Sequence, residues 1–173
     1  MKKTLKLFVL AAAMLFGTQA FGQVTVTAGY QQPSYSAEGF SWNINGFYAG
    51  VMTQFQMTDM LYFEPGLLFD FGAKDGDSIS YLRLPLHLGA GFALGNGFEL
   101  FANAGPGVAI GLFGSNDFFD DHKRFDINLG LEGGLRINDR YEFRIGYDWG
   151  LLKQADYSKI HRGIMHVGLA YRF

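Results

Sequence analysis

The sequence predicts an all-β protein, an eight-stranded antiparallel up-and-down transmembrane β-barrel preceded by a cleaved signal peptide. Three observations carry this prediction. Apolar and polar residues alternate with a period of two, short turns alternate with longer connections, and glycine falls almost wholly on the polar face of the alternation. The 173 residues are 49% hydrophobic and only 17% charged, as expected of a chain that exposes an apolar surface to lipid.

The composition excludes several classes of protein. The chain has no Cys, which excludes a disulfide-stapled fold, a thiolate metal site and a lipidated N-terminal Cys. Its 18 Phe and 9 Tyr exclude disorder, and its net charge of −2 gives no general attraction to nucleic acid. No phosphate-binding loop, zinc-protease or serine-hydrolase motif occurs. We therefore expect one domain with no cofactor, no metal and no nucleic-acid partner.

The first residues are typical of a secretory signal peptide. Lys2, Lys3 and Lys6 precede the apolar run 7–16, and small residues follow it. The run is shorter than the about 20 apolar residues that a membrane-spanning helix needs. Cleavage after Ala20 or Gly22 fits the pattern, and we favour Gly22. The predicted division is therefore a signal peptide at 1–22 and a barrel domain at 23–173.

The mature chain repeats one pattern. In residues 141–151, aromatic or aliphatic residues occupy every odd position, and charged residues or Gly occupy every even position. Side chains of a strand point alternately to opposite faces, so one face is apolar and the other polar or bare. The same pattern gives eight candidate strands, at 24–31, 43–56, 61–73, 79–94, 98–113, 124–137, 141–152 and 162–173. Most are long enough for a tilted bilayer crossing of about 9–11 residues.

The connections alternate in length. Residues 57–60, 95–97 and 138–140 are tight and rich in turn residues. Residues 32–42, 74–78, 114–123 and 153–161 are mostly longer and more polar. Short turns on one side and long loops on the other are typical of outer-membrane barrels. Both chain ends then lie on the short-turn side, which requires an even number of strands.

Glycine decides which face is inside. A soluble lipocalin-like barrel also has eight strands, but its apolar face points inward. Here most strand glycines lie on the polar face, and only Gly133 and Gly163 lie on the apolar face. Because an eight-stranded barrel has a crowded interior, small residues suit the inside and bulky ones the outside. The apolar face is therefore predicted to meet lipid.

Aromatic residues gather near both ends of the predicted strands, as in the girdles at membrane interfaces. The expected short-turn girdle contains Phe55, Phe63, Phe98, Tyr141, Phe143, Tyr171 and Phe173. The expected loop-side girdle contains Phe47, Phe69, Phe71, Tyr147 and Trp149.

The C-terminus carries a more specific resemblance. Residues 162–173 resemble the C-terminal insertion signal of outer-membrane barrels, matched by His166, Gly168, Tyr171 and Phe173. The mature chain also resembles the small outer-membrane β-barrel domain family that includes PorT-like and OmpX-like proteins of Bacteroidetes. The resembling phrases are Phe63-Glu64-Pro65-Gly66-Leu67-Leu68, Tyr81-Leu82-Arg83-Leu84-Pro85-Leu86, Ala104-Gly105-Pro106-Gly107 and Arg124-Phe125-Asp126.

That resemblance implies a location and partners. A protein of this family reaches the Gram-negative outer membrane through the periplasm. Its implied partners are outer-membrane lipid, lipopolysaccharide and the barrel-assembly machinery that inserts it. The PorT-like likeness further implies an accessory role in protein secretion.

The polar face predicts a charge network inside the barrel. Buried charges must be paired, so these residues are expected to fill the lumen rather than line a channel. The predicted network contains Glu64, Asp70, Arg83, His87, Glu99, Arg124, Asp126, Glu132, Arg136, Glu142, Arg144, Asp148, His166 and Arg172. Two ion pairs, Glu132–Arg144 and Glu142–Arg136, are expected across the hairpin that turns at Asn138-Asp139.

The loops could carry a different function. Asp117, Asp120, Asp121 and His122 form an acidic cluster that lacks the EF-hand spacing, so we expect an ordinary solvated loop. Beside it, Phe118-Phe119 are expected at the upper membrane interface. A lipid-modifying enzyme would need an activated nucleophile, and two clusters offer one: His122 with Ser115 and Asp120, and His161 with Ser158 and Asp156. The sequence also leaves open a small passive pore, and glycan binding by Tyr30, Tyr35, Phe40 and Trp42.

The leading expectation is a non-enzymatic structural or interaction protein, with an extracellular or periplasmic protein partner that the sequence does not identify. Surface adhesion and a secretion accessory are the finer possibilities. No catalytic residue is assigned.

Overall fold

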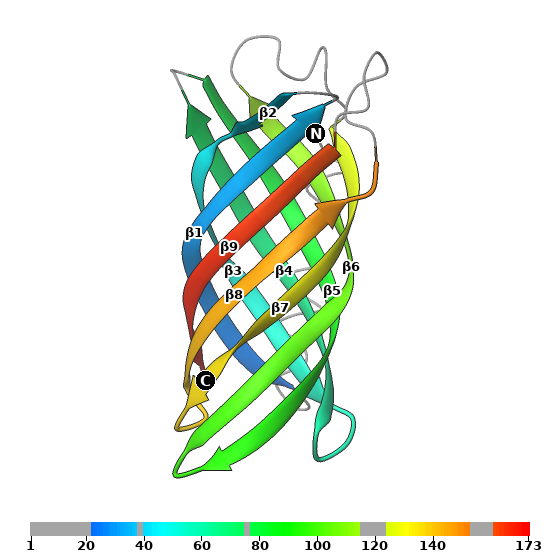
Figure 1. Cartoon of the computed structure of the whole chain (residues 1–173). Coiled ribbons are helices and arrows are strands. Elements are labelled where there is room, and N and C mark those ends of the chain that lie inside the picture. Colours follow the sequence, from blue (N-terminus) through cyan, green and yellow to red (C-terminus); the bar gives the residue numbers. More distant parts are fainter. Residues whose placement is uncertain (1–21, 38–39, 75–76, 115–123, 153–160) are drawn as a thin grey trace.

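A computed structural model describes residues 22–37, 40–74, 77–114, 124–152 and 161–173 (Figure 1). Every regular element in these residues is a β-strand. The strands are β1 (Gln23–Ala37), β2 (Phe40–Asn43), β3 (Asn45–Gln56), β4 (Leu61–Lys74), β5 (Asp77–Gly95), β6 (Phe98–Gly114), β7 (Phe125–Ile137), β8 (Tyr141–Gly150) and β9 (His161–Arg172). None of the described residues forms a helix of the length and hydropathy required to cross a membrane.

The strands close into a barrel. From β3 to β9 each strand pairs antiparallel with the next, and β1 pairs with β3 on one side and with β9 on the other, where Gly29 lies opposite Gly168. β2 and β3 both pair with β1 and are interrupted only at Ile44, whose amide donates to the Pro33 carbonyl at 2.8 Å. They therefore act as one interrupted strand, and the predicted eight-stranded barrel is confirmed. Closure pairs the sheet edges, which hydrocarbon cannot solvate.

The first two long connections were predicted wrongly. Residues 32–37 continue β1 and pair with the first half of β9, while 40–43 form β2 and pair back onto β1. The polar composition of this segment is typical of a loop, but pairing with β9 satisfies its backbone groups. Likewise β4 ends at Lys74 and β5 begins at Asp77, so the expected connection 74–78 shrinks to two residues. Polar residues extend these strands past the apolar belt, where water replaces lipid on the outer face.

The turns between strands have the expected chemistry. Asn138 and Asp139 both adopt positive φ, at 51° and 56°, between β7 and β8. Two successive positive φ values are the geometry that Asn and Asp tolerate in tight hairpin turns. Gly95, Asn96 and Gly97 do the same between β5 and β6. These turns share one end of the barrel with the β3–β4 connection and with the C-terminus, and we call it the turn end (Figure 1). The opposite end is the loop end.

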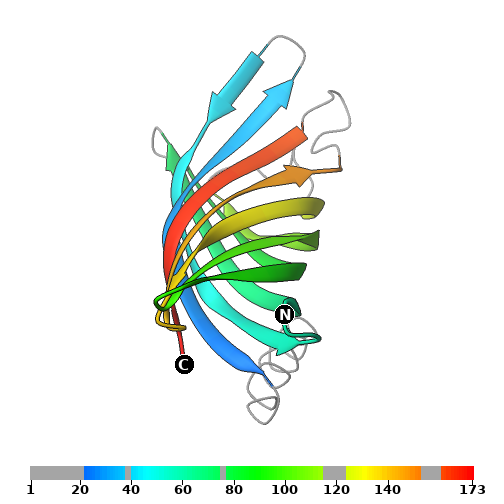
Figure 2. The same ribbon diagram turned by 60° about the horizontal axis from the view of Figure 1, so that its bottom comes forward.

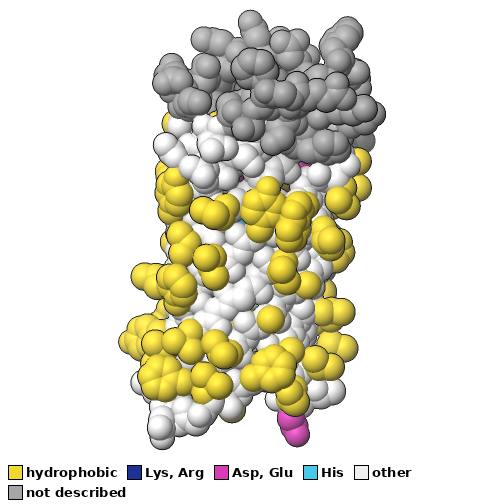
Figure 3. All heavy atoms as spheres, viewed as in Figure 1, with side chains coloured by type: hydrophobic (Ala, Val, Ile, Leu, Met, Phe, Trp, Pro, Cys, Tyr) yellow, Lys and Arg dark blue, Asp and Glu magenta, His cyan; other side chains and the backbone are white. Residues whose placement is uncertain are grey.

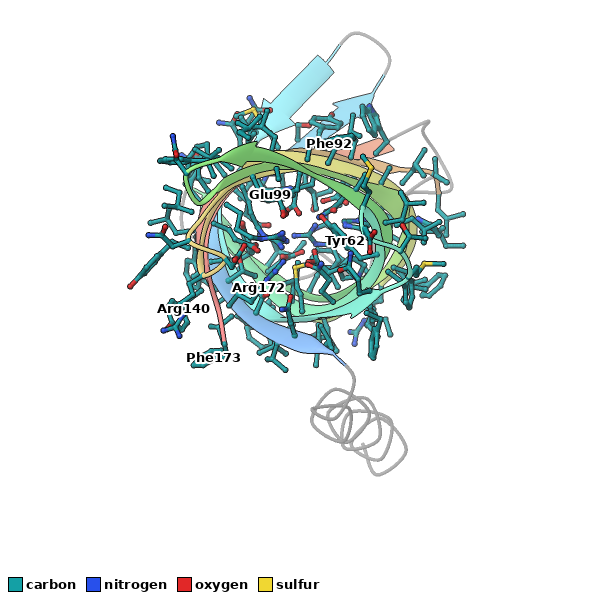
Figure 4. All side chains as sticks on the ribbon, turned by 90° about the horizontal axis from the view of Figure 1, so that it is seen from below. Tyr62, Phe92, Glu99, Arg140, Arg172 and Phe173 are labelled. Carbon is teal, nitrogen blue, oxygen red and sulfur yellow. The ribbon has the colours of Figure 1, made fainter. Side chains whose placement is uncertain are left out.

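The two faces of the barrel are those that the alternation predicts. Large apolar side chains such as Leu88, Leu131 and Leu169 are exposed on the outside, and hydrophobic side chains are spread over the described part of the face seen in Figure 3. Viewed along the axis in Figure 4, Tyr62, Glu99 and Arg172 point into the barrel, whereas Arg140 and Phe173 lie outside it. On a soluble chain this apolar surface would cause aggregation, so it requires lipid around it.

Inward glycines make room for large lumenal side chains. A Cβ at Gly134 would overlap the Phe101 ring, and one at Gly89 would overlap the Tyr62 ring. Phe101 and Tyr62 are both buried inside the barrel. The glycines on the polar face therefore leave the backbone uncovered, and aromatic rings from other strands pack against it, as expected of a crowded interior.

Candidate functional site: the charged lumen

The barrel interior is filled by ionisable side chains. Five arginines (Arg83, Arg136, Arg144, Arg162 and Arg172) and six carboxylates (Glu64, Asp70, Asp126, Glu132, Glu142 and Asp148) are buried there, with His87 and His166. Charges removed from water are stable only when paired and hydrogen-bonded. The arrangement of these side chains along the barrel is therefore the principal candidate site.

Arg144 on β8 is the centre of the network. Its guanidinium binds both carboxylate oxygens of Glu64 from β4, each at 3.0 Å. It also binds Glu132 from β7 at 2.8 Å and Glu142 from its own strand at 2.7 Å. Its side chain is fully buried, and the Phe101 ring centroid lies 5.2 Å from its Cζ. One guanidinium thus joins carboxylates from three strands across the lumen.

The network continues toward the turn end. Arg136 binds Glu142 at 2.8 Å and also pairs with Glu99, which is partly exposed at the mouth of the barrel. Arg172 lies 3.5 Å from Glu142 and donates to the amide oxygens of Gln23 and Gln54. We call Arg136, Arg144, Arg172, Glu64, Glu99, Glu132 and Glu142 the turn-side cluster. Figure 4, which views the barrel from the turn end, shows Glu99 and Arg172 pointing into the interior.

A second cluster lies toward the loop end. Arg83 binds both oxygens of Asp70, at 2.9 and 3.1 Å, and pairs with Asp148. Arg162 lies 3.9 Å from Asp70, with its guanidinium 3.9 Å above the centroid of the Tyr81 ring. Asp126 lies at the level of Arg83, because both pair in register with Ala109. We call Arg83, Arg162, Asp70, Asp126 and Asp148 the loop-side cluster.

His166 on β9 lies between the two clusters. Its Nε2 lies 3.3 Å from Glu132 and its Nδ1 lies 3.4 Å from Asp148. His87 on β5 is also buried, but the described residues include no ion-pair partner for it. His166 is therefore the side chain through which the turn-side and loop-side clusters meet.

Most of the predicted lumen residues are buried inside the barrel. The two expected ion pairs are present: Glu142 lies directly opposite Arg136, and Glu132 reaches Arg144 diagonally. Arg124 is the exception, because it is exposed immediately before β7. The sequence reasoning missed Arg162, which is buried. Its even position in β9, in phase with His166 and Gly168, is the signal that could have found it.

The residues of the predicted C-terminal signal and aromatic girdles lie on either the inner or the outer face of the barrel. In the C-terminal signal, His166 and Gly168 are buried on the inward face of β9, while the half-buried Tyr171 shares the outward face with Phe173. Figure 4 shows Phe173 outside the barrel. Tyr171 packs against Tyr141 and Phe173, with ring centroids 5.4 and 5.0 Å apart, as expected of a turn-side girdle. On the loop side, the rings of Tyr147 and Trp149 lie 4.8 Å apart.

The residues predicted for glycan, metal or catalytic sites lie only partly within the described part of the chain. Tyr35, expected at a glycan-binding loop, is fully buried in the lumen, because residues 32–37 are strand. The acidic cluster 117–122, Phe118-Phe119, Ser115, Asp156 and Ser158 lie outside the described residues, as does the signal peptide up to residue 21. Within the described residues, no group of three or more His, Cys, Asp or Glu is placed to hold a metal ion.

A closed eight-stranded barrel with an apolar outer surface and a polar, filled interior defines an integral outer-membrane β-barrel protein. Comparison with known families agrees: the outer membrane protein beta-barrel domain matches residues 5–173. The chain belongs to this family and resides in the Gram-negative outer membrane. The narrower PorT-like likeness has no support from the comparisons.

Solved structures show the same fold at low sequence identity. Ail of Yersinia pestis, the attachment invasion locus protein, has a TM-score of 0.51 and 18% identity over 88% of this chain and 99% of its own. Neisserial surface protein A has a TM-score of 0.57 and 14% identity over 87% and 97%. The outer membrane enzyme PagL has a TM-score of 0.53 and 15% identity over 87% and 98%. No curated protein gives a significant sequence match.

Proposed function

We propose that the chain is a non-enzymatic structural or interaction protein of the outer membrane, with a lumen that is a plug rather than a passage. The observation that carries this proposal is the paired network inside the barrel. Arg144 alone joins Glu64, Glu132 and Glu142, and all four side chains are almost completely buried. An ion that entered the lumen would have to break several of these charge-assisted bonds, each worth about 1.5–3 kcal/mol.

The loop end favours an interaction role. β1 and β2 form a hairpin there that extends past the neighbouring strands (Figure 2). In an outer-membrane barrel the short turns face the periplasm, so this end faces the outside of the cell. A rigid barrel that presents a hairpin to the outside suits contact with another surface more than it suits transport.

Two finer roles belong to this proposal. Surface adhesion is one, since the attachment invasion locus protein of Yersinia pestis shares the fold. An accessory role in protein secretion is the other, from the PorT-like resemblance of the sequence. A deletion strain separates them: loss of attachment supports adhesion, and loss of secreted proteins supports secretion.

Conductance in planar lipid bilayers tests the plug directly. The purified barrel should give no steady single-channel current at moderate voltage. The double variant R144A/R83A, which removes the central cation of each cluster, should conduct more than the wild type, and R140A should behave as the wild type because Arg140 lies outside the barrel. Steady channels in the wild-type protein would instead indicate a small pore.

A lipid A assay tests the non-enzymatic part of the proposal. PagL shows that this fold can carry an outer-membrane enzyme. Lipid A from membranes with and without the protein should have the same mass spectrum. A protein-dependent loss or gain of an acyl chain would overturn the proposal and favour the two Ser, Asp and His clusters of the loops.

A further inference from the structure

The turn-side cluster holds more carboxylates than guanidiniums. It has four carboxylates (Glu64, Glu99, Glu132 and Glu142) and three guanidiniums (Arg136, Arg144 and Arg172). Counted by itself, the turn-side cluster is therefore one positive charge short of neutrality. Uncompensated charge in a buried, low-dielectric site is costly, so the lumen requires a further source of positive charge.

His166 is placed to supply it. Its Nε2 faces the Glu132 carboxylate at 3.3 Å, and its Nδ1 faces the Asp148 carboxylate at 3.4 Å, with only 5% of the side chain exposed. Its register partner on β8 is Gly146, where a Cβ would lie 2.8 Å from the imidazole Cε1. The imidazole ring therefore packs against the backbone of Gly146, where the missing side chain leaves room for it.

The chemistry of the two partners sets the protonation state of the ring. A neutral imidazole carries one N–H and one lone pair, so it would turn the lone pair of one nitrogen toward an ionised carboxylate. The imidazolium instead carries an N–H on both nitrogens and pairs with both carboxylates as a cation, with Nε2 alone in hydrogen-bonding geometry. We propose that His166 is held as an imidazolium whose positive charge joins the turn-side and loop-side clusters, and that loss of this proton uncouples them and loosens the lumen.

The other groups around the ring fit this role. Tyr48 from β3 lies edge-on at 5.7 Å, and Gln31 from β1 is the register partner on the other side. On β5, His87 is buried nearby, and Arg83 binds the same Asp148 that faces His166. Arg83 opposes a second positive charge, whereas Glu132 and Asp148, from β7 and β8, favour it from within 3.4 Å of the ring.

The proposal makes the barrel sensitive to pH in one direction. Folding takes up the proton that His166 shares with the two carboxylates, so the barrel is most resistant to unfolding on the acid side of the histidine range. As the pH rises and the imidazolium loses its proton, the link is lost and resistance falls.

Nitrogen NMR of the wild-type barrel in detergent micelles reads the ring directly. Selective ¹⁵N labelling of histidine should show one buried imidazole with both nitrogens protonated at about pH 6. A neutral single tautomer for His166 at that pH would overturn the proposal. This measurement needs no variant, so it stands even if substitution of His166 impairs refolding.

Unfolding rates with a matched control give the second test. The wild-type rate in urea should rise about tenfold between about pH 6 and pH 8, as the loss of a charge-assisted bond implies. H166Q should unfold quickly at both pH values. H87Q removes the other buried histidine and should keep the wild-type pH dependence. The same pH dependence in H166Q as in the wild type would refute the proposal.

Discussion

Removal of the Arg144 guanidinium is the most decisive perturbation of the lumen. R144A deletes the only cation that contacts Glu64 among the described residues, and it also deletes one partner each of Glu132 and Glu142. Glu142 keeps Arg136 at 2.8 Å, and Glu132 keeps His166 at 3.3 Å. Glu64 keeps only the amide of Asn103, at 3.2 Å. One buried carboxylate is therefore left without a countercharge.

The contacts that R144A deletes set the expected loss in the free energy of unfolding. Breaking a buried ion pair by removing one partner destabilises a protein by about 3–5 kcal/mol. R144K keeps a charge but loses the paired contacts to both oxygens of Glu64, so it should lie between R144A and the wild type. The second-site change E64Q removes the stranded charge and should return at least about 1 kcal/mol to R144A.

Urea unfolding of the purified barrel in lipid vesicles, followed by the gel-mobility difference between folded and unfolded forms, measures these free energies. R140A is the control, because the exposed Arg140 side chain makes its only hydrogen bond among the described residues to the Tyr171 hydroxyl, at 3.4 Å. It should stay within about 0.5 kcal/mol of the wild type. If R144A unfolds at the same urea concentration as R140A, the view that ion pairs hold the lumen together is wrong.

Three further predictions test the wall of the barrel. A Cβ at Gly134 would meet the Phe101 ring and the Phe143 carbonyl, whereas one at Gly133 would meet nothing closer than 3.4 Å. G134A should therefore lower the free energy of unfolding, measured in urea, by about 1–3 kcal/mol. Equal urea midpoints for G134A and G133A would contradict the packing of Phe101 against Gly134. Leu131 is 51% exposed at the middle of β7. L131R should therefore lower the free energy of unfolding in vesicles by about 2–4 kcal/mol. A loss under about 0.5 kcal/mol would argue that lipid does not meet this face. Asn138 has a φ of 51° in its turn. N138V should therefore lower the melting temperature of the folded form on gels, by an amount equivalent to about 1–2 kcal/mol, while N138G leaves it nearly unchanged. An unchanged melting temperature for N138V would refute the left-handed turn.

The alternation of apolar and polar residues was enough to predict the barrel and its two faces. A period of two is a property of the extended chain, so Glu142, Arg144 and Asp148 had to share a face whatever the tertiary structure was. The crowding of a small barrel then fixed that glycine-rich face as the inner one. The ion pairs Arg136–Glu142 and Arg144–Glu132 were also within reach, because both cross a short hairpin whose turn is visible in the sequence.

The pairing of charges across the lumen, in contrast, follows from the way the barrel closes. Arg144 and Glu64 are 80 residues apart, and they meet because closure brings β4 and β8 to opposite walls of one narrow interior. His166 joins two clusters for the same reason. The first connection was also a tertiary matter, since its polar residues become strand only when β9 is there to pair with them. Local patterns fix which face a side chain occupies, but its partner depends on strand register and on distance across the barrel, which no local pattern contains.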